Sequence, residues 1–458
     1  MRRPLFIDCA DSSRPHFELD RSLRLVAFYA TLFYYCEQRA HPSSQERFFP
    51  AQKPLWLTPS ARVGDNLCCC ALCNREEKMN LGRNILALAL GFAVAASAAS
   101  AKAQDKLVIG SSAGLTGYLA TIDRAWTDAL KLASDIVNNQ AGVLGRKIQV
   151  VIEDNQSQPQ DAVTSYRKMI SSDHANVFIS GCLSAGNLAA VPIVMRQEIP
   201  MIVCSIIAHD AKQASWMFST IPPPAFEVAT RMQYLHDSTK IRKVGVIYDQ
   251  SPYATLLMNS AKKLAPKYEM TVVGAEQYQQ SDVDLSVIIK KLQADGAQAI
   301  LKMGVGPSTL TAAKDMKELA LKIPLLTSSE DLAVFRKVAK VLGKDFFFVA
   351  GPTQFYDALA DNDPLKATIG NFLKPWRAKY GDRDPTWAGR GYDAVMFLRE
   401  AINRAHSFDG AKIRASLETI HGFQGTSGAY NFDKSHYGVT KNPYRLGQFI
   451  DGKLVLVN

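Results

Sequence analysis

Ser184 lies in the segment Gly181-Cys-Leu-Ser-Ala-Gly186, where two glycines flank a serine as they do in the nucleophile elbow of hydrolases. In that elbow one residue separates the first glycine from the serine, whereas two separate them here. His209 is the histidine expected closest to this segment, and no acidic residue is placed to orient it as a base. The sequence therefore favours a protein that is not an enzyme. A serine hydrolase that uses Ser184 as its nucleophile is the alternative to that prediction.

Ser184 can also bind an anion. It follows the apolar run 177–179 and precedes a helical pattern that begins near Asn187. Hydroxyl and backbone N–H groups at such a helix start favour a carboxylate. Ser184 or Asn187 can instead simply cap the helix. Ser205 follows the next apolar run, 201–203, where a loop contact with a ligand is also expected.

Only one pair of cysteines is placed where a disulfide is expected. Cys182 and Cys204 follow what we expect to be neighbouring strands, so a disulfide forms in an oxidising compartment if their Cα atoms lie within about 7 Å. Otherwise they are small buried residues. Cys70 and Cys73 form a C-x-x-C, but no second ligand pair at suitable spacing completes a zinc site. We expect no metal and no organic cofactor.

Composition excludes several classes of protein. Of 458 residues, 47% are hydrophobic and 21% charged, which is the composition of a globular chain and not of a disordered or collagen-like one. The length allows two to three domains. The net charge of +10 is spread along the chain without a dense basic run, so nucleic-acid binding is not indicated.

Residues 79–103 have the layout of a secretory signal peptide: Arg83, an apolar stretch over 85–96, and a small-x-small cleavage site at Ala101-Lys-Ala103. The competing interpretation is a short transmembrane anchor. Residues 1–78 contain six of the eight cysteines, and we interpret them as a spurious N-terminal extension of the reading frame. The signal peptide predicts a periplasmic protein.

Strand-like and helix-like patterns alternate from residue 107 onward. The predicted strands cover 107–110, 148–152, 177–179 and 201–203, and then 244–247, 270–273 and 299–301. Apolar residues at helical spacing separate them, and 389–405 is a further amphipathic helix. Such alternation predicts α/β architecture with two parallel sheets, in the runs 107–203 and 244–350. Ligands of open α/β sheets bind beyond the carboxyl ends of the strands.

Three segments carry a resemblance to a known family. Residues 109–117, residues 138–147 and the segment Gly391-Tyr-Asp-Ala394 resemble type I periplasmic substrate-binding proteins, in particular the leucine/isoleucine/valine branch that serves ABC importers. The resemblance implies two doubly wound, Rossmann-like lobes joined by a three-crossing hinge. The crossings are expected near 221–224, 351–355 and 425–430. Lobe 1 would then be 104–222 plus 355–427, and lobe 2 would be 223–354 plus 428–458.

The resemblance also implies a ligand site between the lobes. Ser184, Ser205 and Ile207 match first-lobe contacts to a ligand carboxylate, and Tyr253 and the Ser329/Glu330 pair match second-lobe contacts, one of them an acid that binds an ammonium group. Which of Ser329 and Glu330 holds the place of that acid depends on one inserted residue.

The second-lobe residues Tyr253, Ser329 and Glu330 also have purely structural alternatives. Tyr253 can line the surface of its lobe. Ser328 or Ser329 can cap the next helix, with Glu330 complementing its dipole. Val305 stands where the family has an aromatic contact, which enlarges the expected pocket.

The function implied is that of a monomeric periplasmic receptor that closes over a small carboxylate-bearing ligand, an amino acid by preference. Aromatic acids or small amides are the alternative, because Val305 and Ile207 make the pocket roomier and more apolar. No ATP-binding motif of the G-x-x-x-x-G-K-[ST] type is present, so the permease and its ATPase are expected to be separate chains.

Overall fold

The computed structural model describes residues 106–432 and 435–457. The predicted extension at 1–78 and the predicted signal peptide at 79–103 lie outside the described residues. The strands are β1 (Lys106–Ala113), β2 (Lys147–Asp154), β3 (Val177–Ser180), β4 (Met201–Val203), β5 (Met217–Ser219), β6 (Lys243–Asp249), β7 (Thr271–Tyr278), β8 (Ala299–Met303), β9 (Leu325–Thr327), β10 (Phe346–Ala350), β11 (Phe423–Gly425), β12 (Gly428–Tyr430), β13 (Arg445–Ile450) and β14 (Lys453–Val457). The α-helices are α3 (Ala120–Asn139), α4 (Pro159–Ser171), α5 (Ser184–Arg196), α6 (Ala211–Ala214), α7 (Ala225–Ser238), α8 (Pro252–Leu264), α9 (Ser286–Ala294), α10 (Ser308–Glu318), α11 (Leu332–Leu342), α12 (Pro364–Tyr380), α13 (Thr386–Ala405) and α14 (Gly410–Leu417).

The first sheet has five strands in the order β2-β1-β3-β4-β5, all parallel. Its apolar strands are buried on both faces, as a parallel sheet covered by helices requires. Four of the five strands coincide with predicted ones. The fifth, β5, has only three residues, which is too short for a periodicity to stand out.

The second sheet has seven strands in the order β14-β13-β10-β9-β8-β6-β7. The five from β6 to β10 are parallel, and the predicted strands at 244–247, 270–273 and 299–301 fall within this set. The C-terminal strands β13 and β14 extend the sheet in antiparallel fashion beyond β10. The sequence therefore predicted the parallel core of this sheet, and the structure adds its antiparallel edge.

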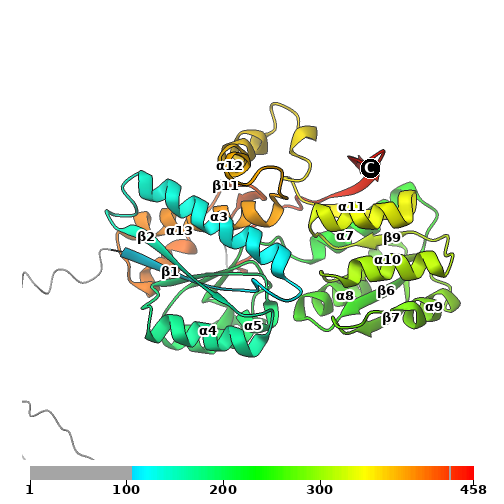
Figure 1. Cartoon of the computed structure of the whole chain (residues 1–458), viewed down its shortest axis with the longest axis horizontal. Coiled ribbons are helices and arrows are strands. Elements are labelled where there is room, and N and C mark those ends of the chain that lie inside the picture. The colour runs from blue at the N-terminus through cyan, green and yellow to red at the C-terminus, as the bar shows by residue number, and fades with distance from the viewer. Residues whose placement is uncertain (1–105, 433–434, 458) are drawn as a thin grey trace, which may run out of the picture. The chain divides into compact units, whose positions relative to one another are not determined.

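Helices cover both faces of each sheet, which makes each a doubly wound lobe, as predicted. In Figure 1, α3 and α13 lie together on one face of the first sheet, and α4 and α5 lie on the other. The apolar stripe of α3 that the sequence indicated is buried: Ile122, Trp126, Leu130 and Val137 all belong to the first lobe's core. On the second sheet, α7 and α8 form one core with the strands, and α9, α10 and α11 form another.

Three crossings connect the lobes. The first lies between β5 and α7, where Ile221–Pro224 was expected to mark a boundary. The second follows β10 and leads to α12, which packs in the first lobe's core through Phe372 and Trp376. Two of the three expected hinge positions thus fall between elements of different lobes.

The third crossing differs from the expectation near 425–430. Tyr430, Phe432 and Val439 all belong to the first lobe's core, and Tyr437 bridges to β5 of the first sheet. The chain therefore returns to the second sheet only between Val439 and Arg445. Gly-rich turns around the hairpin β11–β12 resemble a crossing in the sequence, because a hairpin and a linker use the same turn residues.

Each sheet contains a switch point, where the strand order reverses. It lies between β1 and β3 in the first sheet and between β6 and β8 in the second. Loops that follow these neighbouring strands diverge to opposite faces and leave a crevice at the carboxyl ends, where ligands of such sheets bind. In the second lobe this loop needs Gly304, whose φ is +97° and whose position would place any Cβ against the Asp249 carboxylate.

Cys182 and Cys204 form a disulfide, with Cα atoms 4.5 Å apart. This resolves the alternative that the sequence left open. The two residues follow β3 and β4, which are paired neighbours, so the bond joins the loops that follow these strands in the first lobe. The loop after β3, which borders the crevice, is therefore covalently held to the loop after β4.

We predict that removing this disulfide lowers stability without changing the fold. The bond closes a loop across 22 positions of sequence. In the chain-entropy account, a loop of that length contributes about 3 kcal/mol. Chemical denaturation of Cys182→Ala/Cys204→Ala should show this loss, and a reductant should lower the stability of the wild-type protein to the same level. Equal stability of the two proteins under oxidising conditions would contradict the prediction.

Candidate functional site

A small cavity of about 30 Å³ lies where the two crevices meet, and we call it the central cavity. Residues of both lobes line it: Leu119, Ile122, Cys182, Ser184, Cys204, Ser205, Ile221, Glu227, Tyr253, Val305, Trp387 and Arg390. Most of them follow the carboxyl ends of strands β1, β3, β4, β5, β6 and β8. The topology therefore brings the cavity together from loops of both sheets.

Four of the seven residues predicted from the sequence line the central cavity. Ser184 and Ser205 do so from the first lobe, and Tyr253 and Val305 from the second. The other three, Ile207, Ser329 and Glu330, do not belong to the lining.

Ser184 begins α5, and its hydroxyl has no hydrogen-bond partner among the described residues. The helix has Leu183 at its N-cap and no side-chain cap, so neither Ser184 nor Asn187 serves as the cap considered above. The Asn187 amide instead donates to the Gly181 carbonyl at 2.8 Å and to the Ser205 hydroxyl at 3.0 Å. Ser205 is thus fixed by a structural bond, whereas the Ser184 hydroxyl is available at the cavity.

Asp123 holds the two loops of the first crevice together. Its buried carboxylate accepts the Gly114 N–H at 2.6 Å, after β1, and the Cys182 N–H at 2.8 Å, after β3. Burial raises the pKa of Asp123 to about 7, and the two backbone hydrogen bonds oppose that rise. This side chain therefore positions the loop that carries Ser184.

On the second lobe, the buried Glu227 and the half-buried Tyr253 form a hydrogen-bonded pair at the cavity. The Tyr253 hydroxyl donates to Glu227 Oε1 at 2.5 Å, and the Ser329 N–H donates to Glu227 Oε2 at 2.9 Å. Burial raises the pKa of Tyr253 well above its ordinary value, and the neighbouring Glu227 carboxylate adds to the rise. Ser329 therefore acts through its backbone, and its own buried hydroxyl has no partner in the described part of the chain.

Glu330 is engaged inside the second lobe. Its carboxylate accepts the Gly306 N–H and the Thr309 hydroxyl, each at 2.7 Å, and Lys302 shares the same Thr309 hydroxyl at 2.8 Å. Burial raises the pKa of Glu330, and the Lys302 charge counteracts this. The N-cap of α11 is Asp331, which accepts the Ala333 N–H, so the serines before it do not cap this helix. Glu330 thus stabilises the loop that carries Val305.

Ile207 lies in an apolar cluster of the first lobe, and its N–H donates to the Tyr437 hydroxyl at 3.4 Å. It packs in the lobe instead of lining the cavity. His209, considered above as a base, is exposed and is not part of the lining either.

Sequence reasoning missed Glu227, Trp387 and Arg390. The last two lie one turn apart on α13, whose amphipathic pattern was noted. Arg390 stands among Ala388, Gly389 and Gly391, all of them buried, and a charged residue inside the apolar stripe of a helix was the available signal. Within residues 106–432 and 435–457, no group of three or more His, Cys, Asp or Glu side chains could hold a metal ion.

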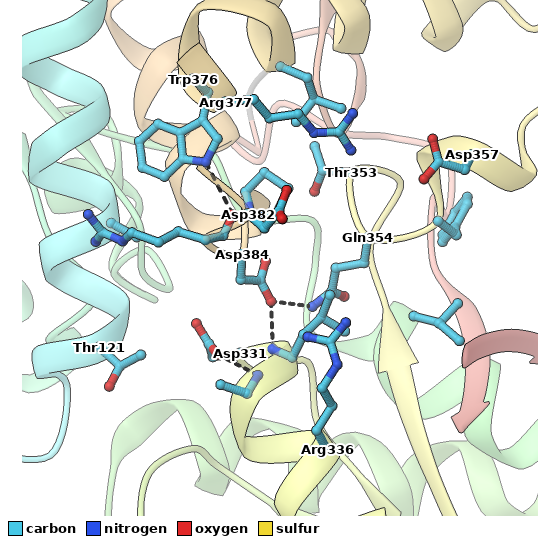
Figure 2. Close-up of a pocket in the computed structure, with 18 of the residues that line it drawn as sticks. Thr121, Asp331, Arg336, Thr353, Gln354, Asp357, Trp376, Arg377, Asp382 and Asp384 are labelled. Atoms are coloured by element: carbon cyan, nitrogen blue, oxygen red, sulfur yellow. Dashed lines mark hydrogen bonds between the residues drawn. The ribbon is translucent and has the colours of Figure 1, made fainter. Parts of the chain in front are cut away.

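A second and larger cavity, of about 890 Å³, borders the second crossing, and we call it the hinge-side cavity. Figure 2 shows Asp331, at the start of α11, and Asp384, just before α13, on its wall. Asp384 accepts the Leu332 N–H at 2.6 Å and the Gln354 amide at 3.0 Å. Because Leu332 belongs to the second lobe and Asp384 precedes a first-lobe helix, these bonds connect the lobes beside the hinge.

A family model described as "Periplasmic binding protein" matches residues 106–453. Leu/Ile/Val-binding protein homolog 7 of Brucella abortus is 23% identical over 391 residues, covering 82% of this chain and 96% of that protein. No helix in the described residues has both the length and the apolar character needed to cross a bilayer.

Two solved structures illustrate the likeness in fold. The branched-chain amino acid binding protein LivJ of Streptococcus pneumoniae, in complex with isoleucine, superposes with a TM-score of 0.65 at 20% identity and covers 77% of this chain and 99% of its own. An ABC-transporter solute-binding protein of Rhodopseudomonas palustris, in complex with benzoate, gives 0.65 at 21%, covering 77% and 95%.

The carboxylate pair at the hinge generates a pH prediction. Burial, and then the Asp384 charge, raise the pKa of Asp331 to about 6. The folded state therefore binds this proton more tightly than the unfolded state, in which aspartate titrates near about 3.9. Its stabilising contribution is full below about pH 4 and is lost as the pH rises to about 6.

Asp331→Asn keeps a capping side chain but no longer titrates. Between pH 4 and 7, the free energy of unfolding of the wild-type protein should fall relative to this variant by up to about 3 kcal/mol. Asp409→Asn is the matched control, because Asp409 caps α14 at an exposed position. Parallel pH profiles for the wild type and Asp331→Asn would disprove the assignment.

Proposed function

Since the chain belongs to the periplasmic binding protein family, we propose that it is the solute-binding receptor of an ABC importer and closes over a small carboxylate-bearing ligand. The observation that carries this proposal is the central cavity, which the switch-point loops of two separate lobes line together. A ligand bound there contacts both lobes at once, so its binding energy favours the closed arrangement.

The size of the central cavity supports the closing motion. About 30 Å³ is far below the roughly 300–1,000 Å³ of small-molecule sites. A solute of amino-acid size therefore enters when the lobes separate, and the three crossings are where the chain bends. We assign residues 106–222 and 355–439 to the first lobe, and 223–354 and 440–457 to the second.

The first-lobe wall of the central cavity supports the proposal that the ligand carries a carboxylate. Ser184 lies at the start of α5, where a free hydroxyl and unpaired backbone N–H groups favour an anion. Isoleucine and benzoate, the ligands in the two solved structures described above, both carry a carboxylate. Amino acids, the class expected from the sequence, and amine-free aromatic acids are thus both candidates.

The proposed receptor function also implies where the protein acts and which chains it acts with. Residues 79–103, with the layout of a signal peptide, would direct export to the periplasm. The closed receptor would then be recognised, as a monomer, by a permease whose ATPase is a separate chain. The relatives are named as binding proteins, which fits a function without catalysis.

The first test is a thermal-shift screen of residues 104–458 with amino acids, aromatic carboxylates and small amides. A ligand at 100 times its Kd adds about 2.7 kcal/mol of stability, so a cognate carboxylate should raise the Tm by several degrees. Stabilisation by neutral amides alone would contradict the proposed carboxylate site.

A second test uses the two serines. Ser184→Ala should weaken binding of the carboxylate found in the screen about tenfold, because a hydrogen bond to a charged group is lost. Ser205→Ala should also weaken it. The Tm of the ligand-free protein should change little in Ser184→Ala and fall modestly in Ser205→Ala, because the Asn187 amide loses one acceptor. Ser134→Ala, at a buried serine outside the lining, is the matched control. Unchanged affinity in both variants would remove these serines from the site.

A further inference from the structure

Arg390 is a buried cation that forms no ion pair in the described chain, although the Glu227 and Asp393 carboxylates act on it from a longer distance. Its side chain is 1% exposed and lines the central cavity. Nη2 donates to the Tyr444 hydroxyl at 3.2 Å and Nε to the Ser427 hydroxyl at 3.4 Å, and both acceptors are neutral. No carboxylate of the described chain lies within ion-pair distance of this guanidinium. Burial disfavours this charge, whereas Glu227 and the surrounding tyrosines favour it. An anion in direct contact with the guanidinium would add a charge-assisted hydrogen bond that the described chain does not supply.

Trp387 presents a second donor at the same wall. It lies three residues before Arg390 on α13, so the two side chains share one helix face, and the guanidinium lies 4.6 Å from the centre of the indole ring. Both residues line the central cavity. The indole Nε1 is buried, and the described residues offer it no hydrogen-bond partner. Buried N–H groups are normally paired, so this one indicates an acceptor supplied by a ligand.

The lining offers little to an ammonium group. Glu227 is its only carboxylate. Each Glu227 oxygen already accepts one bond, from the Tyr253 hydroxyl and from the Ser329 N–H. Glu330, the other acid considered for this role, is held by Gly306 and Thr309 away from the cavity. The Glu227 carboxylate is thus already shared between two donors, whereas the Trp387 N–H at the same cavity has no acceptor in the described chain.

Apart from the hydroxyl groups of Ser184, Ser205 and Tyr253, the remaining lining is apolar. Leu119, Ile122, Ile221 and Val305 contribute aliphatic surface, and the disulfide contributes its sulfur atoms. Such walls suit the hydrocarbon body of a ligand and give no hydrogen bond to a polar substituent.

We propose that Arg390 and Trp387 bind the carboxylate of the ligand, and that the ligand is an apolar organic monocarboxylate without an α-ammonium group. This inference rests on the proposed receptor function and names the ligand class of the same site. The ammonium of an amino acid would have to share the Glu227 carboxylate with Tyr253 and Ser329, which leaves the buried charge weakly compensated. Arg390 and Trp387 are thus the residues that determine specificity.

The discriminating experiment uses ligand pairs that differ only in the amino group, measured by isothermal titration calorimetry on residues 104–458. The pairs are hydrocinnamate with L-phenylalanine and isocaproate with L-leucine, and benzoate with benzamide tests the charge itself. At least one amine-free acid should bind at least tenfold more tightly than its amino-acid counterpart, and benzoate more tightly than benzamide. Tighter binding of the amino acids would overturn this inference and leave the receptor function intact. Failure of all six compounds would count against the carboxylate-receptor function itself.

Two conservative variants test whether Arg390 and Trp387 bind the carboxylate. Arg390→Lys keeps the charge but loses the planar fork, and Trp387→Phe keeps a ring but loses the N–H. Each should weaken binding of the best amine-free acid about tenfold or more.

Trp126→Phe is the matched control, because Trp126 also has a buried N–H without a partner in the described residues but lies outside the lining. The ligand-free Tm is measured for all three variants, so that loss of fold is distinguished from loss of contact. Wild-type affinity in both Arg390→Lys and Trp387→Phe would exclude these side chains as the anion site.

Discussion

Parallel strand pairing is the constraint on which the site depends. When neighbouring strands run in the same direction, every loop that follows a strand emerges at the same edge of the sheet. In both lobes the order of strands reverses next to the first strand of the lobe, β1 or β6. Helices then leave to opposite faces and open a crevice between them. Residues as far apart in sequence as Leu119 and Val305 thereby line one cavity.

The buried charges near this cavity fall into two kinds. Lys302 and Glu330 meet at the Thr309 hydroxyl, and Asp123 is held by two backbone N–H groups. These charges have their partners within their own lobe and fasten the loops in place. Arg390 has only hydroxyl partners, and its neighbour Trp387 has an indole N–H that is not paired in the described structure. The charges with partners in their own lobe therefore build the site, whereas Arg390 and Trp387 have donors that can bind a ligand.

The hinge shows how the two lobes are coupled outside the cavity. Gln354, on the second crossing, donates both to the Glu330 carbonyl and to the Asp384 carboxylate, each at 3.0 Å. Asp384 also accepts the Leu332 N–H at the start of α11. One polar cluster thus links the second crossing, a second-lobe helix and the segment before α13. Asp331 caps α11 beside this cluster, where burial and the Asp384 charge raise its pKa.

Much of the fold could be predicted from the sequence, because it depends on local patterns. Apolar runs and helical spacing indicated the parallel strands and the buried stripe of α3, and the ordered motifs indicated the family. Failures came where local pattern is weak: β5 has only three residues, and the turns around β11–β12 resemble a linker. Antiparallel addition of β13 to β10 joins segments about a hundred positions apart, which no local periodicity reports.

By itself the sequence determined the α/β class, the two-lobed family and the loops in which Ser184, Ser205, Tyr253 and Val305 lie, since position after a strand is a local property. Only the tertiary structure decided which charges are already paired. Glu330 is held inside its lobe, Cys182 and Cys204 are joined, and Arg390 lines the cavity with neutral partners alone. Pairing depends on contacts between residues distant in sequence, and burial makes those contacts energetically decisive.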